Sequence, residues 1–217
     1  MEVALRTRTV GSPCDGGTAP LLVVLDGPDY VSRARLVPVL RRQVETGVLP
    51  AHRVALVSAA DRFEAFTASA RYGRALLAAL DELGRARRVG VGSSLGALAL
   101  LHAHRLEPRA FAGLFLQSGS FFRRRTDPQE RGLPRFGRID RFVGGVLSGV
   151  DGARPVPTTI TCALDEENYA NNAVLAQALA AQGYSVDFHA ARGGHDWPTW
   201  RRALESHLPA LLRSVWR

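Results

Sequence analysis

The chain has 217 residues, of which 46% are hydrophobic, and its formal net charge is +8. This length suits one globular domain, and this composition excludes collagen-like and disordered proteins. No apolar run reaches the ~18 residues that a membrane-spanning helix needs. The N-terminal stretch lacks the apolar segment of a signal peptide, so we expect a cytoplasmic protein without membrane contact.

Charge and cysteine content limit the expected partners. All 28 basic residues are arginine and are scattered along the chain, and no nucleic-acid-binding motif accompanies them. We therefore expect no nucleic acid, whereas an anionic small molecule remains open as a ligand. Cys14 and Cys162 form neither a disulfide framework nor a metal pattern, and they predict one loop thiol and one buried strand thiol. No metal or cofactor is expected.

Short apolar, β-branched runs alternate with helical patterns along the chain. The period-two alternation of residues 2–10 predicts an antiparallel edge strand. Buried strands are predicted at 21–27, 53–59, 87–92, 111–119, 158–164 and 184–190. Helical spacing is found at 32–47, 72–84, 95–106, 171–183 and 197–216. In the first of these helices, Pro38 argues for a break or a late start.

Strands that alternate with helices of this length are typical of a mostly parallel sheet covered on both faces. We therefore expect one α/β domain over residues 1–217. The least regular segment, 122–153, lies between two predicted strands. It is predicted to form a helical or loop insertion over one end of the sheet.

The run Gly-Ser-Ser-Leu-Gly matches the pattern G-x-S-x-G, with Ser94 as its central serine. A predicted strand precedes it and a predicted helix follows, which is the context that a nucleophilic serine needs. Gly92 and Gly96 leave room for the sharp, strained turn. The positive end of the helix points at the serine, so the Leu95 N–H can donate to an oxyanion. The alternatives are Ser93, which lacks the symmetric glycines, and a turn without chemistry.

A serine nucleophile needs a base and an acid. In α/β-hydrolases the chain order is serine, acid, histidine, with the histidine in a loop after the last strand. His195 fits this place in its glycine-rich loop. The acid should follow the preceding strand, where Asp165, Glu166 and Glu167 stand together. One of them can fix the imidazole tautomer, although acidic residues are also common at solvated helix N-termini.

These residues together resemble the catalytic domain of the enterochelin esterases, within the esterase D group of α/β-hydrolases. The resemblance is carried by VLDGPDY, GSSLGALALLHAHRLEPRAFAGLFLQSGSFF, CALDEENYANNAVLAQAL and GGHDWPTWRRAL. It implies an α/β-hydrolase fold and hydrolysis of siderophore or related acyl esters without a cofactor. It also implies Ser94 as nucleophile and His195 as base. The acid pattern of the family favours Glu166, whereas ungapped counting back from His195 favours Asp165.

One position departs from the family. The second oxyanion donor of the family is a backbone N–H just after "DG", where this chain has Pro28, which has no N–H. The resemblance then implies Gly27 or Asp29 as the substitute donor. A weak oxyanion hole would also suit a non-catalytic binding protein with this fold. Acyl transfer to an alcohol is the enzymatic alternative, because it uses the same triad.

Candidate substrate contacts follow the fourth predicted strand. The run "RRR", with Arg123 and Arg124, lies at the carboxyl ends of the strands, where open α/β sheets bind ligands. Guanidinium groups bind anionic oxygens bidentately, so these arginines predict a rim for an anionic ester. The alternative is a solvated surface turn. Phe121 and Phe122 could face an aromatic acyl group, and Trp197 completes the candidate set.

Overall fold

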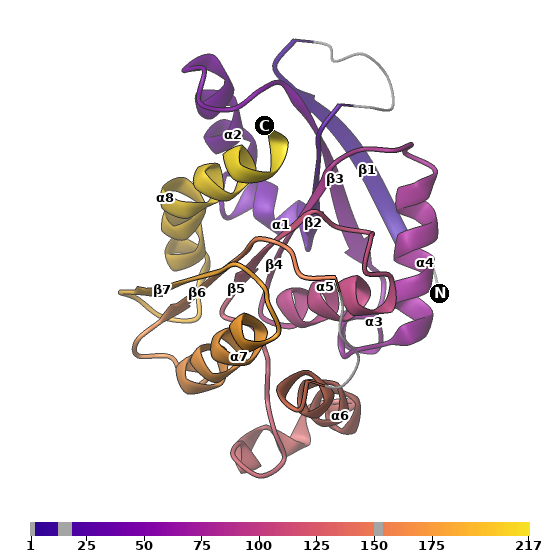
Figure 1. Ribbon diagram of the computed structural model, residues 1–217, viewed down its shortest axis with the longest axis vertical. Coiled ribbons are helices and arrows are strands. Elements are labelled where there is room, and N and C mark those ends of the chain that lie inside the picture. The colour runs from indigo at the N-terminus through magenta and orange to yellow at the C-terminus, as the bar shows by residue number, and fades with distance from the viewer. Residues whose placement is uncertain (1–2, 13–18, 150–153) are drawn as a thin grey trace.

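The computed structural model describes residues 3–12, 19–149 and 154–217. Its centre is a seven-stranded sheet in the order β1-β3-β2-β4-β5-β6-β7 (Figure 1). The strands are β1 (Val3–Val10), β2 (Leu21–Leu25), β3 (His52–Ala59), β4 (Arg88–Ser93), β5 (Gly113–Gln117), β6 (Thr158–Ala163) and β7 (Val186–Ala191). Neighbouring strands are parallel except for β1, which pairs antiparallel with β3. The predicted antiparallel edge strand is thus confirmed.

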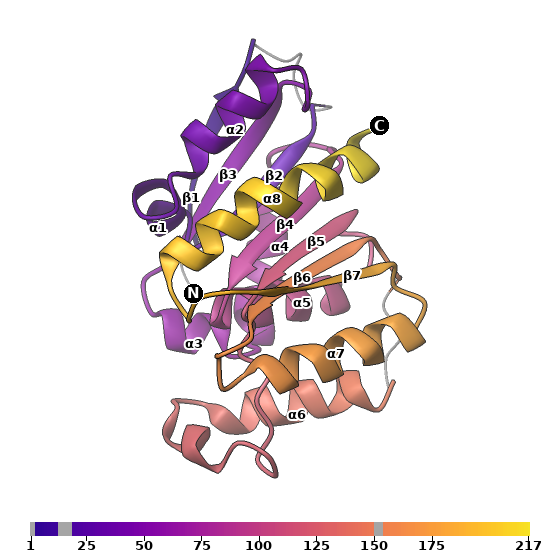
Figure 2. The ribbon, with the colours of Figure 1, turned by 90° about the vertical axis from the view of Figure 1, so that its left-hand side faces the viewer.

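Helices cover both faces of the sheet (Figure 2). One face carries α1 (Gly27–Ser32), α2 (Leu36–Glu45) and α8 (Trp197–Trp216). The other face carries α3 (Arg62–Phe66), α4 (Ala70–Asp81), α5 (Leu95–Leu106) and α7 (Tyr169–Ala181), with α6 (Phe136–Leu147) outside α7. No helix among the described residues is long and apolar enough to cross a membrane.

Each face of the sheet has its own hydrophobic core, and the strands supply both. In β2, Leu21, Val23 and Leu25 enter the core under α4 and α5, while Leu22 and Val24 enter the core under α2 and α8. This division follows from the alternation of side chains along a strand. Every residue of β2, β4, β5 and β6 is buried, as expected of parallel strands covered on both sides. The predicted α/β class is confirmed.

The helix predicted at 32–47 starts late. α1 ends at Ser32 and α2 begins at Leu36, so Pro38 lies in the first turn of α2. The first turn has no intrahelical acceptor for its N–H groups, and the missing N–H of proline therefore costs nothing there. The short helix α3 was not predicted. The Asp61 side chain caps it by accepting a hydrogen bond from the Glu64 N–H at 2.9 Å.

The insertion predicted at 122–153 is largely helical in its described part. It contains a 3₁₀ helix, η2 (Pro128–Gly132), followed by α6. The apolar stripe of α6, which includes Phe136, Ile139 and Val143, packs inward against the core. Of the two cysteines, Cys162 is a buried free thiol in β6, and Cys14 lies outside the described residues.

Candidate active site

Ser94 lies at the turn between β4 and α5. Its backbone has φ 54° and ψ −123°, a strained conformation for a residue other than glycine, as the predicted sharp turn requires. A Cβ at Gly92 would lie 2.6 Å from the carbonyl of Gly96, so only glycine fits there. A Cβ at Gly96 would come no nearer than 3.4 Å to its neighbours, which is ordinary contact. The steric requirement of the turn therefore falls on Gly92.

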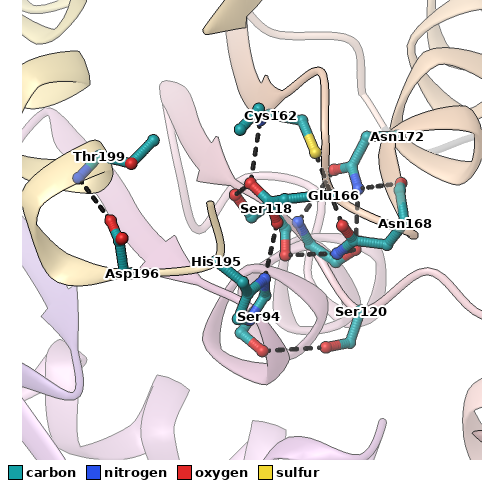
Figure 3. Close-up of polar contacts among 12 residues, drawn as sticks. Ser94, Ser118, Ser120, Cys162, Glu166, Asn168, Asn172, His195, Asp196 and Thr199 are labelled. Atoms are coloured by element: carbon teal, nitrogen blue, oxygen red, sulfur yellow. Dashed lines mark hydrogen bonds and ion pairs between the residues drawn. The ribbon is translucent and has the colours of Figure 1, made fainter. Parts of the chain in front are cut away.

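The Ser94 side chain opens into a cavity of about 520 Å³ that Ser120, Asp165, Glu166 and His195 also line. Its Oγ lies 3.1 Å from the Oγ of Ser120 (Figure 3). Among the described residues no hydrogen bond joins Ser94 to His195, although both face the same cavity. Catalytic hydrogen bonds are often loose without substrate and tighten when it binds.

His195 pairs with Glu166, whose Oε2 lies 2.7 Å from the imidazole Nδ1. The Glu166 side chain is only 2% exposed, and its Oε1 accepts hydrogen bonds from Ser118 Oγ at 2.7 Å and from the Ala163 N–H at 2.9 Å. Burial raises the pKa of Glu166, but the hydrogen bonds from His195, Ser118 and Ala163 outweigh it and leave this pKa lowered. Glu166 therefore stays ionised as the partner of the imidazole.

The three adjacent carboxylates differ in their surroundings. Asp165 and Glu167 are exposed at the cavity, whereas Glu166 is buried. The turn after β6 folds the Glu166 side chain back onto the Ala163 N–H, and this places its carboxylate beside the imidazole Nδ1 of His195. Of the two alternatives that the sequence left open, the structure brings Glu166 and not Asp165 to His195.

No protein-family model and no curated protein matches the chain. Its structure is similar to that of the enterobactin esterase from Shigella flexneri, with a TM-score of 0.78 and 24% identity over 97% of this chain and 55% of that one. A ferulic acid esterase matches with a TM-score of 0.73 and 18% identity over 99% of both chains. S-formylglutathione hydrolase from Staphylococcus aureus matches with a TM-score of 0.65 and 12% identity over 97% of both chains. The chain has the α/β-hydrolase fold.

At these low identities the structural similarity shows the fold of the chain and not its activity. The structural match includes the catalytic domain of the enterochelin esterases, in agreement with the resemblance seen in the sequence. The chain spans about half the length of those esterases.

The candidate oxyanion donors lie at the starts of two helices. Leu95 begins α5 and lines the cavity. Gly27 begins α1, so its N–H belongs to a first turn that lacks intrahelical acceptors. The Asp29 N–H already donates to the Asp26 carbonyl at 3.0 Å and is not available as a donor. Neither Gly27 nor Asp29 is among the residues that line the cavity.

The structure does not bring the predicted arginine rim to the cavity. Arg123 Nε donates to Asp140 at 2.9 Å, and Arg124 lies 3.9 Å from the same carboxylate, with its guanidinium 5.8 Å from the ring of Phe136. The chain turns away after Phe122 into the insertion, where α6 supplies the acidic partner. These arginines pair within the insertion and are not among the residues that line the cavity beside Ser94.

Two of the predicted aromatic substrate contacts, Phe121 and Trp197, do not line the cavity. Phe121 is 1% exposed and packs on Gly119 within the core. Trp197 packs edge-on against Tyr30 and Trp200, with ring centroids 5.2 and 4.9 Å apart. Phe122, which the sequence suggested together with Phe121, does line the cavity.

Several cavity residues were missed by the sequence. Arg62 and Phe63 come from α3, Glu130 from η2 and Leu133 from the segment that follows it. The Arg62 guanidinium lies 2.8 Å from the Asp26 carboxylate, so its charge is compensated. Burial, reinforced by the neighbouring Glu167 and Asp127 carboxylates, raises the pKa of Glu130 to about 7. No local motif marks these positions, because they reach the cavity only through the fold.

The other histidines have partners away from the cavity. His52 lies 2.9 Å from the Pro50 carbonyl, and His104 lies 3.0 Å from the Arg154 carbonyl. His189 stacks on His207 with ring centroids 3.7 Å apart. His102 packs edge-on against Phe142, with ring centroids 4.9 Å apart. His195 is thus the base candidate. In the part of the chain that the structure describes, no three His, Cys, Asp or Glu side chains group so that they could hold a metal ion.

Proposed function

We propose that the chain is a serine esterase that hydrolyses small carboxylic esters through an acyl-enzyme. The observation that carries this proposal is the 2.7 Å contact between His195 and the buried Glu166, in the same cavity as the strained serine of the elbow. The structural neighbours support it, because they are named enterobactin esterase, ferulic acid esterase and S-formylglutathione hydrolase.

The contact with Glu166 determines which nitrogen of the His195 ring carries hydrogen. An ionised carboxylate only accepts hydrogen bonds, so the Nδ1 that faces Glu166 carries hydrogen in the neutral ring. The Nε2 is then the acceptor, as a general base requires. In the proposed first step Ser94 Oγ attacks the ester carbonyl while His195 Nε2 takes its proton. Glu166 stabilises the imidazolium that results.

The remaining steps of the proposed reaction are stabilisation of the oxyanion, departure of the alcohol and hydrolysis of the acyl-enzyme. The Leu95 N–H, whose residue lines the cavity, stabilises the oxyanion of the tetrahedral intermediate. When this intermediate collapses, the carbon–oxygen bond to the alcohol breaks and His195 returns its proton to the alcohol. Water, deprotonated by His195, then attacks the acyl-enzyme and releases the acid and the free Ser94 hydroxyl.

We further propose that the substrate is an ester with an aromatic acyl group. Phe63 and Phe122 give the cavity aromatic walls, and Phe63 is 41% exposed there. One enterobactin esterase structure was determined in the presence of 2,3-dihydroxy-N-benzoyl-serine, and a second neighbour is a ferulic acid esterase. Both names contain an aromatic acid.

Labelling by a fluorophosphonate probe tests this function, because the probe reacts only with an activated serine. We expect labelling and p-nitrophenyl ester hydrolysis in the wild type and in Ser93→Ala, and neither in Ser94→Ala. Equal labelling of the wild type and Ser94→Ala would place the nucleophile at another serine. No labelling of the wild type would favour a non-catalytic binding protein. Methyl ester formation in added methanol would show acyl transfer to an alcohol.

A further inference from the structure

A buried hydroxyl outside the cavity contacts the carboxylate that pairs with His195. Ser118 directly follows β5, is 1% exposed and does not line the cavity. Its Oγ lies 2.7 Å from Glu166 Oε1 and 3.0 Å from the indole Nε1 of Trp200, at the start of α8. Figure 3 shows Ser118 beside Glu166, on the side away from Ser94.

The donor and acceptor roles in this contact are fixed by chemistry. The indole N–H of Trp200 can only donate, so Ser118 Oγ must accept from it. The one hydroxyl hydrogen of Ser118 is then directed at Glu166, which accepts because it is ionised. Hydrogen bonds therefore run from Trp200 to Ser118 to Glu166, and from His195 to the same carboxylate.

These bonds set the orientation of the carboxylate. Oε1 accepts from Ser118 and from the Ala163 N–H, which leaves Oε2 for His195. Rotation of the carboxylate would break all three hydrogen bonds. Trp200 also packs edge-on against the His195 ring, with centroids 5.0 Å apart and planes at 82°. The same indole thus contacts the imidazole and orients the hydroxyl that holds the acid.

The backbone of Ser118 is held in a strained conformation. Its φ is +46°, which is uncommon for a residue other than glycine. The Ser118 N–H donates to the Thr161 carbonyl at 2.7 Å, and its carbonyl accepts from Asn168 Nδ2 at 3.0 Å. The next residue, Gly119, is bonded through its N–H and its carbonyl to Asn172. Strain that the surroundings enforce in this way is concentrated at functional sites.

We propose that Ser118, oriented by Trp200, is a positioning residue that presents Glu166 to His195 in the orientation that catalysis needs. Neither side chain touches the substrate in this proposal, which rests on the proposed esterase function. Ser118→Ala should therefore lower kcat and leave KM nearly unchanged. Loss of one hydrogen bond to a buried charge predicts a decrease in kcat of about 10- to 100-fold.

The pH profile separates positioning from mere stability. Without the Ser118 donor the Glu166 carboxylate is more basic and binds the imidazolium more tightly, so the acid limb of kcat/KM moves to higher pH. Trp200→Phe should move the acid limb of kcat/KM to higher pH as well, but by less. This variant tests the proposal if Ser118→Ala does not fold. The fold-decrease in kcat of the double variant should be smaller than the product of the fold-decreases of the two single variants, because both substitutions act through the Ser118 hydroxyl.

Thr158→Val is the matched control, because its buried Oγ1 donates to the Val156 carbonyl at 3.1 Å away from the cavity. It should lower Tm without moving the acid limb. An acid limb and kcat in Ser118→Ala that match those of Thr158→Val would overturn the proposal. An inactive wild type would instead overturn the esterase function, and the NMR titration of the His195 ring would still test Ser118. Its midpoint should rise in Ser118→Ala, and an unchanged midpoint would contradict positioning.

Discussion

Three neighbouring carboxylates, Asp165, Glu166 and Glu167, show how one position in a turn decides the chemistry of a residue. All three are acidic and adjacent, yet only the middle one is buried and meets the imidazole. Its two neighbours face solvent at the cavity. Burial gives Glu166 fixed donors in place of water, and these donors keep it charged.

Glu166→Gln should therefore lower turnover strongly, by up to about 10⁴-fold, because an amide cannot enforce the tautomer that leaves Nε2 as acceptor. Asp165→Asn and Glu167→Gln should leave turnover nearly unchanged, since neither carboxylate contacts the imidazole. Single-turnover kinetics with a p-nitrophenyl ester would measure all three variants. A large loss in Asp165→Asn with a mild one in Glu166→Gln would contradict the geometry.

The pH dependence of activity follows from the same pair. A lowered pKa keeps Glu166 ionised as the pH falls through the neutral range, so its protonation does not set the acid limb there. The limb should instead report protonation of the base, because only a neutral imidazole accepts the proton of the serine. We expect kcat/KM to fall as the pH is lowered from about 8 to about 5, the range in which histidines change charge. A flat profile between about pH 5 and 8 would exclude His195 as base.

At the scale of elements, ion pairs join parts of the insertion to one another and join the insertion to α3. Asp140 in α6 binds the Arg123 side chain and the Arg124 N–H, each at 2.9 Å. Glu64 in α3 binds Arg135 and Arg138, at 2.8 and 2.9 Å. The backbone hydrogen bond from Arg124, with the guanidinium groups beside it, lowers the pKa of Asp140. The arginine-rich composition thus has a structural use in this segment.

Asp140→Asn should lower the free energy of unfolding by about 1 kcal/mol, because it weakens hydrogen bonds at a partly exposed site. Arg123→Ala with Arg124→Ala should change KM for an anionic and a neutral ester equally, since neither guanidinium reaches the cavity. Thermal denaturation and paired kinetics with the two esters would check both expectations. A KM increase confined to the anionic ester would restore the arginine rim.

The sequence predicted the elements that carry their own local signal. The elbow at Ser94 and the place of His195 could be predicted because glycines, strand and helix lie within a few residues of each. The contact of Arg123 could not be predicted, because its partner Asp140 lies 17 residues further along the chain and only the fold brings it close. For the same reason Arg62 and Phe63 could not be assigned to the cavity, and Ser118 could not be linked to Trp200.

At the scale of the whole molecule, the overall charge and the charge of the cavity have opposite signs. The chain carries +8, yet Glu130, Asp165 and Glu167 line the cavity. The Arg62 charge there is compensated by Asp26. Net charge therefore did not predict the local field that a substrate meets.

An ester that bears a quaternary ammonium group should consequently have a lower KM than its carboxylate-bearing analogue of similar size. The difference should shrink at high salt, which screens exposed charges, and below about pH 7, where Glu130 takes up a proton. The double variant Glu130→Gln/Glu167→Gln should remove most of the difference in KM between the two esters. Steady-state kinetics at two salt concentrations would measure this, and a lower KM for the carboxylate ester would contradict it.

The insertion allows the substrate preference of such a protein to change separately from its reacting side chains. Ser94, Glu166 and His195 stand at the ends of the strands, whereas Glu130 and Leu133 form a roof that belongs to a separate stretch of chain. For the proposed esterase, the reacting side chains and this part of the cavity wall are thus encoded in different parts of the gene. A chimera with a foreign segment between Phe122 and α7 would inherit the reaction from the sheet and a new selectivity from the donor.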